Sequence, residues 1–552
     1  MPAAETGSTE RFDAVVVGSG FGGSVMAYRL AEAKLNVCLL ERGKKWPPGS
    51  FPRTPFDFSR ATWDPGNGRH GLFDVWSFKG VGALVSSGLG GGSLIYANVI
   101  LRKDERWFAE VERDYVRQWP VTFKDLEPHY EAVLPFLQPV PYPEHYRDTP
   151  KTRAFYSAAA AEGLDPCYPP LAVTFAGSKE ETGTPFGKPK ENLHGAQRYT
   201  CRLVGECNAG CNFGSKNTLD FTYLSAAERH GLEIRCRHEV KAFEPCSEGF
   251  RIHVADYSKA EEGTASAPEW RVIVARRLIL SAGALGTPYL LLLNRSAFPN
   301  LSRHLGTRFS GNGDFIAFAA RSRIPLQPAR GPVITTSVRV ADVLDDPPGE
   351  GPGHYVQDGG YPDFLAWVAT MLTLPRLGWA ARRTAAKILW GRITGRPDPN
   401  LSAEAAEFLG APRLASGSLP ILGMGREYPQ GRMSLRDGLL DVDWSFDRAR
   451  PYFNHVRSTM SKIAHGLEAE LVDNVLWNLS TVVTSHPLGG CPLGATAAEG
   501  VVDPVTGGVH NYPGLYVADG SVMPGTVGPN PSLTIAALAN RFADGILQEG
   551  KL

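Results

Sequence analysis

The sequence lacks the features that would place a protein in a membrane or outside the cell. Its 552 residues contain no run of 18 or more apolar residues, so no membrane-spanning helix is expected. The segment Met1–Arg11 is polar and has no apolar stretch of the kind found in secretory signal peptides. Eight cysteines in a chain of this length do not amount to a disulfide scaffold. A reducing, cytoplasmic setting is therefore expected.

The sequence also lacks an excess of either charge. Lys and Arg together number 57, as do Asp and Glu, so the formal net charge is zero. A neutral chain has no global field that would attract nucleic acid. Hydrophobic residues make up 43% and charged residues 21%, the proportions of an ordinary globular protein. The length exceeds what one compact core supports, so two or more domains are expected.

A glycine motif follows the first apolar run of the chain. The β-branched run 14–17 predicts a buried parallel strand, and a helical pattern begins a few residues later. Between them lie Gly18, Gly20 and Gly23, spaced as Gly-x-Gly-x-x-Gly. In such a motif the first glycine makes a tight turn, the second lets a pyrophosphate approach the backbone, and the third lets helix and strand pack closely. The pyrophosphate would bind at the helix N-terminus.

An acidic residue supports this interpretation of the glycine motif. A second predicted strand, 37–40, ends at Glu41, which is 23 residues after Gly18. This is where a dinucleotide-binding unit places the carboxylate that binds a ribose hydroxyl. The same carboxylate would repel a 2′-phosphate. A tight turn that binds nothing is the alternative, but the strand, the helix and the acid together favour a dinucleotide site.

Further glycine-rich segments recur along the chain. Four of the five residues 88–92 are glycine, which suits a backbone that passes directly against a flat ligand. Residues 272–274 and 278–280 are predicted to be strands, and 281–288 is a second strand-to-helix turn. A strand at 515–518 leads to Asp519, and 528–531 leads into a predicted helix over 532–547. Residues 44–80, rich in Pro, Gly and aromatic residues, are predicted to form a loop, and 431–444 a hairpin.

The segment 364–397 is basic and contains no acidic residue. Its six basic residues are Arg376, Arg382, Arg383, Lys387, Arg392 and Arg396. A helix here would carry a narrow apolar face opposite basic residues. One hypothesis is an interfacial helix that makes a peripheral contact with an anionic membrane. The alternative, favoured by the narrowness of the apolar face, is a surface helix packed on its own domain.

Three cysteines lie close together in a loop rich in glycine and asparagine. They are Cys201, Cys207 and Cys211. A metal site usually has a fourth ligand and closely spaced cysteine pairs, and this spacing fits that pattern only loosely. Structural packing of the loop is the favoured interpretation, a metal site is the alternative, and no metal is assigned.

The motifs taken together resemble the glucose–methanol–choline (GMC) oxidoreductases. The resemblance rests on the glycine motifs at 18–24, 86–93 and 281–288, the Ser-His-Pro-Leu-Gly-Gly-Cys segment at 485–491, and the segment 516–541. The His-Pro-Leu-Gly-Gly form is most similar to the cholesterol oxidase-like branch of the family. The resemblance touches both ends and the middle of the chain, and its last segment is highly specific.

The resemblance implies an α/β fold and the cofactor FAD. The fold would comprise a doubly wound, Rossmann-like FAD-binding domain and a second α+β substrate-binding domain built on a sheet. Placing the motifs on this plan assigns residues 1–115, 197–311 and 471–552 to the FAD-binding domain. Residues 116–196 and 312–470 are assigned to the substrate-binding domain.

The resemblance also implies particular site residues. His486 matches the active-site histidine and Asn530 the second polar residue, which would hold the substrate oxygen without titrating. The residues implied for FAD are Gly18, Gly20, Phe21, Gly22, Gly23, Glu41, Gly90, Gly92, Ser93, Asn98, Val240, Ala282, Asp519, Gly520, Asn530 and Pro531.

The implied activity is FAD-dependent oxidation of a hydrophobic alcohol, steroid-like or long-chain, to a carbonyl compound. The acceptor that reoxidises the flavin would be O2 or a quinone-like carrier. Alternatives are a non-redox or light-driven enzyme of the same fold, a lyase or fatty acid decarboxylase, and a peripheral-membrane alcohol dehydrogenase. One departure concerns Leu414–Ser418, where relatives that also isomerise sterols carry a glutamate and this sequence has no carboxylate. Glu427 is out of register with that position, so oxidation without isomerisation is expected.

Overall fold

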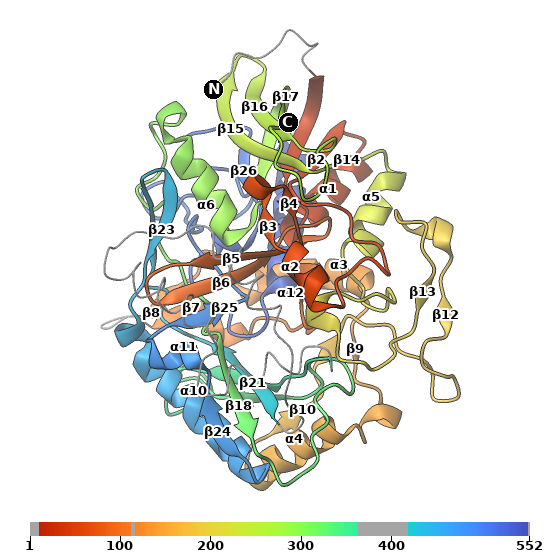
Figure 1. Ribbon diagram of the computed structural model, residues 1–552. Helices are drawn as coiled ribbons and strands as arrows, with labels where there is room; N and C mark the ends of the chain where they lie inside the picture. Colours follow the sequence, from red (N-terminus) through yellow and green to blue (C-terminus); the bar gives the residue numbers. More distant parts are fainter. Residues whose placement is uncertain (1–9, 112–115, 363–417, 550–552) are drawn as a thin grey trace.

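Two large sheets dominate the computed structural model, which describes residues 10–111, 116–362 and 418–549. In Figure 1 one sheet occupies the upper half of the molecule and the other the lower half. A smaller sheet, containing β5, β6 and β25, lies between them (Figure 1). The predicted fold class, a Rossmann-like unit with a second sheet-based unit, is confirmed.

The first sheet is built mainly from parallel strands. Its order is β14-β2-β1-β17-β16-β15, with β26 also paired to β17. The bounds are β1 (Glu10–Val17), β2 (Val37–Glu41), β14 (Glu233–Cys236), β15 (His238–Cys246), β16 (Gly249–Asp256), β17 (Glu269–Leu280) and β26 (Leu515–Val517). The strands β14, β2, β1, β17 and β26 are parallel, whereas β16 and β15 are antiparallel. The run 14–17 is continuously buried, as expected of a strand covered on both faces.

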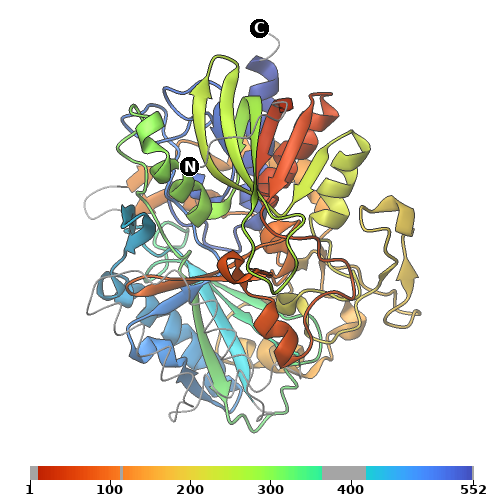
Figure 2. The ribbon, with the colours of Figure 1, turned by 45° about the horizontal axis from the view of Figure 1, so that its top comes forward.

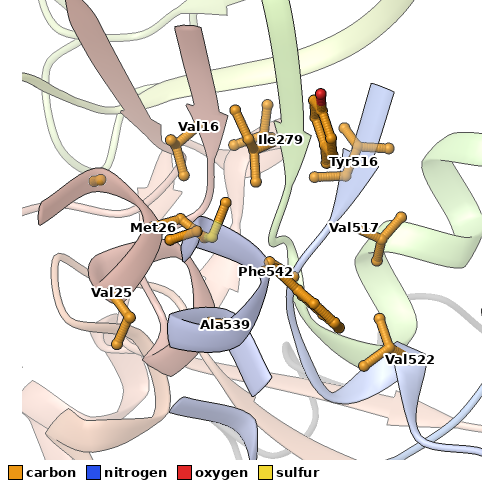
Figure 3. Packing of buried hydrophobic residues seen from close by; sticks show 14 of the residues in the cluster. Val16, Val25, Met26, Ile279, Tyr516, Val517, Val522, Ala539 and Phe542 are labelled. Atoms are coloured by element: carbon orange, nitrogen blue, oxygen red, sulfur yellow. The ribbon is translucent and has the colours of Figure 1, made fainter. Parts of the chain in front are cut away.

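Helices from opposite ends of the sequence cover this sheet. The helix α1 (Phe21–Glu32) packs against α12 (Ser532–Glu549), which in turn packs against α3 (Phe123–Leu137). Figure 3 shows Met26 of α1 and Phe542 of α12 in the same buried cluster as Val16 and Ile279 of the sheet. The core of the first sheet therefore requires residues that are more than 500 positions apart in the chain.

The second sheet is antiparallel and is covered by helices on one face. Its order is β10-β19-β20-β21-β18-β24. The bounds are β10 (Pro166–Cys167), β18 (Phe315–Ala320), β19 (Ser337–Val340), β20 (His354–Asp358), β21 (Leu419–Gly425) and β24 (Glu470–Asp473). The covering helices are α4 (Pro150–Ala161) and α10 (Phe446–Gly466), and α10 lies at the outer edge of the molecule in Figures 1 and 2. Val356 and Ile421 face these helices, so the alternating residues Gln357 and Leu422 belong to the opposite face.

The segment 44–80 corrects a prediction. It was expected to be a loop, yet it contains α2 (Pro55–Arg60), β3 (Trp63–Asp64), β4 (Arg69–His70) and β5 (Phe73–Ser77). The strand β5 pairs with β6 (Val81–Ser86), which also pairs in parallel with β25 (Val482–Thr484). Because β25 is about 400 residues from β6 in the sequence, no local pattern predicts this sheet. Since β6 and β25 are parallel, the glycines that follow β6 and His486, which follows β25, lie at the same edge of this sheet.

The remaining elements are short connections and hairpins. They are β7 (Ala109–Val111), β8 (Val116–Gln118), β9 (Val140–Pro141), β11 (Pro170–Leu171), β12 (Pro185–Phe186), β13 (Arg198–Tyr199), α5 (Ser225–Arg229), α6 (Gly283–Leu293), β22 (Arg432–Arg436), β23 (Leu439–Asp443) and α11 (Val475–Asn478). The predicted hairpin is confirmed, and its turn residues Asp437 and Gly438 have φ values of 53° and 76°. The two strands predicted at 272–274 and 278–280 are one strand, β17, because Arg276 and Arg277 keep the extended backbone and are not fully buried.

The basic segment 364–397 lies outside the described residues. Among the residues that the structure does describe, no helix has the length and apolar character needed to cross a membrane.

Candidate active site

Glycine turns at the ends of several strands of the first sheet and of β6 meet in one place. A Cβ on Gly91 would lie 2.6 Å from the Cα of Gly20, and a Cβ on Gly22 would lie 1.7 Å from the carbonyl oxygen of Ala518. The turn after β17 joins them, since the Ser281 hydroxyl donates a hydrogen bond to the Ala518 carbonyl. The sequence-predicted segments 18–23, 88–92, 281–283 and 518–520 are thus brought together at the carboxyl ends of parallel strands, where open α/β sheets bind ligands.

Glu41 lies at the edge of this region, at the end of β2. Its carboxylate accepts hydrogen bonds from the Ser19 N–H (3.1 Å), the Ser19 hydroxyl (2.5 Å) and the Gly43 N–H (2.8 Å). Burial raises the pKa of Glu41. The Ser19 hydroxyl in turn accepts a hydrogen bond from the Gly90 N–H (3.0 Å), which ties the two glycine turns together. The acid therefore lies beside the first turn, where a ribose-binding carboxylate is expected.

Asp519 forms its hydrogen bonds within the protein. One carboxylate oxygen accepts from the Thr287 hydroxyl (2.5 Å) and the Gly283 N–H (2.9 Å), and the other accepts from Ser521. Burial raises the pKa of Asp519. Asp519 thereby fixes the turn after β17, and the adjoining Gly520 lies next to Pro487 and Leu488.

The region has room and polar groups for an extended ligand. A Cβ on Gly20, Gly92 or Gly283 would meet no atom within 4 Å, so these three glycines border open space. Both polar atoms of the Asn98 side chain and the Ser87 hydroxyl are buried and have no hydrogen-bond partner in the structure. Buried polar groups are normally paired, so these atoms fit the edge of a bound nucleotide. The residues present therefore fit FAD.

The other residues predicted to contact the cofactor surround the same turns. Phe21 begins α1, and its ring lies 5.6 Å from that of Tyr96. Ala282 precedes Gly283 at the start of α6, and Pro531 is buried immediately before α12. Val240 is buried in β15. Just before β15, the Arg237 N–H donates a hydrogen bond to the carbonyl of Gly43, which follows β2. The Ser93 hydroxyl donates to the Gly90 carbonyl.

His486 is oriented by a carboxylate that the sequence did not reveal. Its Nδ1 lies 2.8 Å from Oδ1 of Asp314, and the side chain is 18% exposed. The second oxygen of Asp314 accepts from the His486 N–H, the Ser485 N–H and the Thr484 hydroxyl. Because a carboxylate only accepts, Nδ1 carries the proton and Nε2 is left as an acceptor.

Asn530 is anchored through the turn that precedes it. The Asn312 side chain accepts from the Val527 and Gly528 N–H groups and donates to the carbonyls of Gly528 and Pro529. Lys103 donates from the other end to the carbonyl of Val527. Burial lowers the pKa of Lys103 to about 7. Asn312 and Asp314 are two residues apart, so one segment, residues 310–314, holds both His486 and Asn530.

The 310–314 turn is itself held by a buried acid. Glu427 follows β21, is 1% exposed, and accepts from the Ser310 hydroxyl (3.2 Å), the Gly313 N–H (3.2 Å) and Nε1 of Trp444 (2.6 Å). Burial raises the pKa of Glu427 to about 7. The sequence assigned no role to this residue. The Gly-Asn-Gly-Asp stretch at 311–314 signals a tight turn, but nothing local shows that His486 is its partner.

The three clustered cysteines line one small pocket. Cys201, Cys207 and Cys211 are free thiols, and the Lys216 ammonium lies among them and donates to the Cys207 carbonyl. Burial raises the pKa of the Cys201 and Cys207 thiols. Within the described ranges, no set of three or more His, Cys, Asp or Glu side chains could hold a metal ion. Residues 414–417, in the segment where isomerising relatives would carry a glutamate, lie outside those ranges.

The Rossmann-like sheet and the glycine turns at its carboxyl edge fit a nucleotide-binding oxidoreductase, and comparison of sequences agrees. Two sequence profiles described as GMC oxidoreductase match residues 12–311 and 444–539. The chain belongs to the GMC oxidoreductase family and is an FAD-dependent alcohol oxidoreductase.

Relatives extend over nearly the whole chain. A cholesterol oxidase of Mycobacterium tuberculosis is 30% identical over 96% of this chain and 90% of its own length. A cholesterol oxidase of Acinetobacter baumannii is 28% identical over 96% and 93%, respectively. A long-chain-alcohol oxidase of Arabidopsis thaliana is 24% identical over 96% of this chain and 66% of its own length.

Solved structures share the fold. A variant of formate oxidase from Aspergillus oryzae superimposes with a TM-score of 0.61 at 14% identity, covering 98% of this chain and 99% of that one.

Proposed function

We propose that the protein oxidises a hydrophobic alcohol, steroid-like or long-chain, to the carbonyl compound, and that His486 and Asn530 handle the substrate hydroxyl. The observation that carries the proposal is the hydrogen bond between His486 Nδ1 and Asp314 Oδ1, 2.8 Å long. It fixes the imidazole with Nε2 as an acceptor, which is the state needed to receive a proton from an alcohol.

The roles of the site residues follow from this arrangement. His486 Nε2 accepts the hydroxyl proton, and the Asp314 carboxylate stabilises the imidazolium that forms, as a buried acid does in other catalytic histidine pairs. Asn530, which is buried, positions the substrate oxygen by hydrogen bonding. FAD, when bound, supplies the hydride acceptor. The Ser310–Asp314 turn links the two polar residues, because Asp314 binds His486 and Asn312 binds the backbone just before Asn530.

We propose the same FAD contacts as the sequence predicts. The ADP half would lie along Gly18, Gly20, Phe21, Gly22, Gly23 and Glu41, with Val240 at the adenine, and the rest of FAD along Gly90, Gly92, Ser93, Asn98, Ala282, Asp519, Gly520, Asn530 and Pro531. The open space at Gly20 and Gly92 and the unpaired amide of Asn98 support this placement. The domain boundaries given above are part of the same proposal.

The face of the second sheet beside the site supports an apolar substrate. Leu422 lies opposite Gln357 of β20 and opposite Ile316 of β18, so the three side chains share one face. Leu422 is only partly buried, and Ile316 is 37% exposed. Incompletely covered apolar side chains next to the site would gain from contact with an apolar substrate. The names of the relatives, which refer to cholesterol and long-chain alcohols, point in the same direction.

Anaerobic stopped-flow spectroscopy tests the proposal. The purified protein is mixed with sterols, long-chain primary alcohols, terpenoids and sugars, and bleaching of the flavin band is followed. We expect a sterol or long-chain alcohol to bleach the flavin and His486→Ala to abolish the bleaching. Readmission of air then distinguishes O2 from a quinone-like acceptor by the rate at which the colour returns. If no alcohol bleaches the flavin and His486→Ala behaves as the wild type, a non-redox or light-driven reaction replaces this proposal.

A further inference from the structure

The amide oxygen of Asn530 has a hydrogen-bond donor in the second sheet. Its Oδ1 accepts a hydrogen bond from Nε2 of Gln357, 3.0 Å long, in a buried environment. Nε2 of Gln357 also contacts the Ser337 hydroxyl at 3.4 Å. Since Oδ1 of Asn530 is engaged by this donor, the Nδ2 group points elsewhere.

We infer that Gln357 is a positioning residue that turns the Asn530 amide so that its N–H donors face the substrate oxygen. This inference rests on the proposed function, and it adds a direction to the role of Asn530. Gln357 is the next-to-last residue of β20, is fully buried, and is paired across the sheet with Ser337 and Leu422. Its side chain is therefore held by the second sheet, on the face that carries Leu422.

The backbone of Asn530 is held separately from its side chain. Six hydrogen bonds hold the backbone of residues 526–529. The Asn312 side chain forms four of them, and Lys103 donates the other two, to the carbonyls of Thr526 and Val527. A change at Gln357 therefore frees the direction of the Asn530 amide without releasing the turn. This separation makes the role of Gln357 testable by itself.

The amide direction divides the hydrogen bonds of the hydroxyl between two residues. The substrate O–H donates its proton to His486 Nε2, while the oxygen accepts an N–H from Asn530. As the proton leaves, negative charge grows on the oxygen, and a donor already aimed at that oxygen stabilises the charge. An Asn530 amide turned the other way would present Oδ1 to the same oxygen and repel the charge.

The test compares two variants with a control. Gln357→Met removes the donor at similar volume, and Asn530→Asp replaces the N–H donors with an oxygen that can only accept. The matched control is Ser337→Ala, which removes the other hydroxyl contact of Gln357. FAD content and thermal melting confirm that each variant is folded and loaded.

Two quantities are measured for each variant, namely flavin reduction and ketone binding. The ketone product is used because its oxygen can only accept hydrogen bonds, and its Kd is obtained by calorimetry. We expect Gln357→Met to lower kcat and weaken ketone binding by about tenfold each, the effect of one hydrogen bond. Asn530→Asp should lower kcat by about 10²–10³-fold, as loss of an oxyanion donor does. Ser337→Ala should change neither quantity.

The outcomes separate this inference from the proposed function. If Gln357→Met leaves kcat and ketone affinity unchanged, or if Asn530→Asp retains activity, the amide direction is wrong while alcohol oxidation stands. If His486→Ala is also fully active, the proposed function itself fails.

Discussion

At the scale of single residues, the imidazole of His486 owes its protonation pattern to Asp314. The carboxylate accepts from Nδ1 and from the His486 N–H, so ring and backbone are held by one side chain. This contact determines which ring nitrogen carries the proton, and it does not position the substrate.

Asp314→Asn should therefore lower the rate of flavin reduction by about 10²–10⁴-fold, the range of a general base. An amide at 314 would direct an N–H2 group at donors that now bind a carboxylate, so the ring would lose its fixed tautomer. The measurement is stopped-flow reduction at saturating alcohol, with FAD content as the control for folding. The loss should not add to that of His486→Ala, and fully additive losses would contradict a shared role.

Glu427 is a second residue whose charge state matters. Its pKa of about 7 lies above its ordinary value of 4.5 because it is buried. Between these two pH values the unfolded chain releases the proton and the folded protein keeps it. The contribution of Glu427 to stability is therefore fully present below pH 4.5 and falls as the pH rises towards 7.

Glu427→Gln should remove this pH dependence. From about pH 5 to about pH 7, the free energy of unfolding of the wild type should fall by about 2 kcal/mol relative to the variant. Thermal unfolding at the two pH values measures the difference. The exposed Glu228, replaced by Gln, serves as the control and should show no such change. An equal pH dependence in wild type and Glu427→Gln would show that this carboxyl titrates normally.

At the scale of elements, two glycines of the first glycine turn have different surroundings. A Cβ on Gly20 meets no atom within 4 Å, whereas a Cβ on Gly22 falls 1.7 Å from the Ala518 carbonyl oxygen. Two neighbouring glycines of one motif therefore serve different purposes. Gly20 borders the open space where we propose that FAD binds, and Gly22 allows α1 to approach the turn after β26.

In the absence of FAD, Gly20→Ala should have the same melting temperature as the wild type. It should bind FAD at least about tenfold more weakly, because a clash that costs about 1.4 kcal/mol raises the Kd tenfold. Gly22→Ala should melt at lower temperature whether or not FAD is added. Gly66→Ala, whose Cβ would lie 3.8 Å from Asp64, is the control for a tolerated glycine. Fluorescence titration with FAD and thermal melting measure the two effects. Equal FAD affinity in Gly20→Ala and wild type would remove Gly20 from the binding surface.

The same scale shows what the sequence could and could not predict. The strand–turn–helix unit of β1 and α1 was predictable because its signals lie within about twenty residues. The sheet of β5, β6 and β25 was not, because β25 joins it from the far end of the chain. His486 and Asn530 were found through specific motifs. Asp314, Asn312 and Gln357 were missed because each acts on a partner that is distant in sequence and belongs to no motif.

At the scale of the whole molecule, packing and hydrogen bonding hold the chain together without covalent cross-links between cysteines. All eight cysteines are free thiols, and Cys38, Cys207 and Cys491 are buried.

A reducing agent should therefore leave the melting temperature unchanged, and eight thiols should react after denaturation. In the native protein fewer should react, because burial protects three of them and raises the pKa of several. Thiol titration before and after denaturation, with thermal melting in the presence and absence of reductant, measures both. A clear drop in melting temperature on reduction would reveal a cross-link.

The pairing of α1 with α12, and of β17 with β26, has a consequence for how the protein is made. Val17 leaves the ribosome first, and Leu515 follows 498 residues later. At ordinary rates of translation of 5–20 residues per second this interval is roughly 25–100 s. Throughout this interval α1 lacks its partner helix α12, and β17 lacks β26. Because the proposed FAD contacts include Asp519, Gly520 and Pro531, FAD would be captured only near the completion of synthesis, and cofactor loading would mark a finished chain.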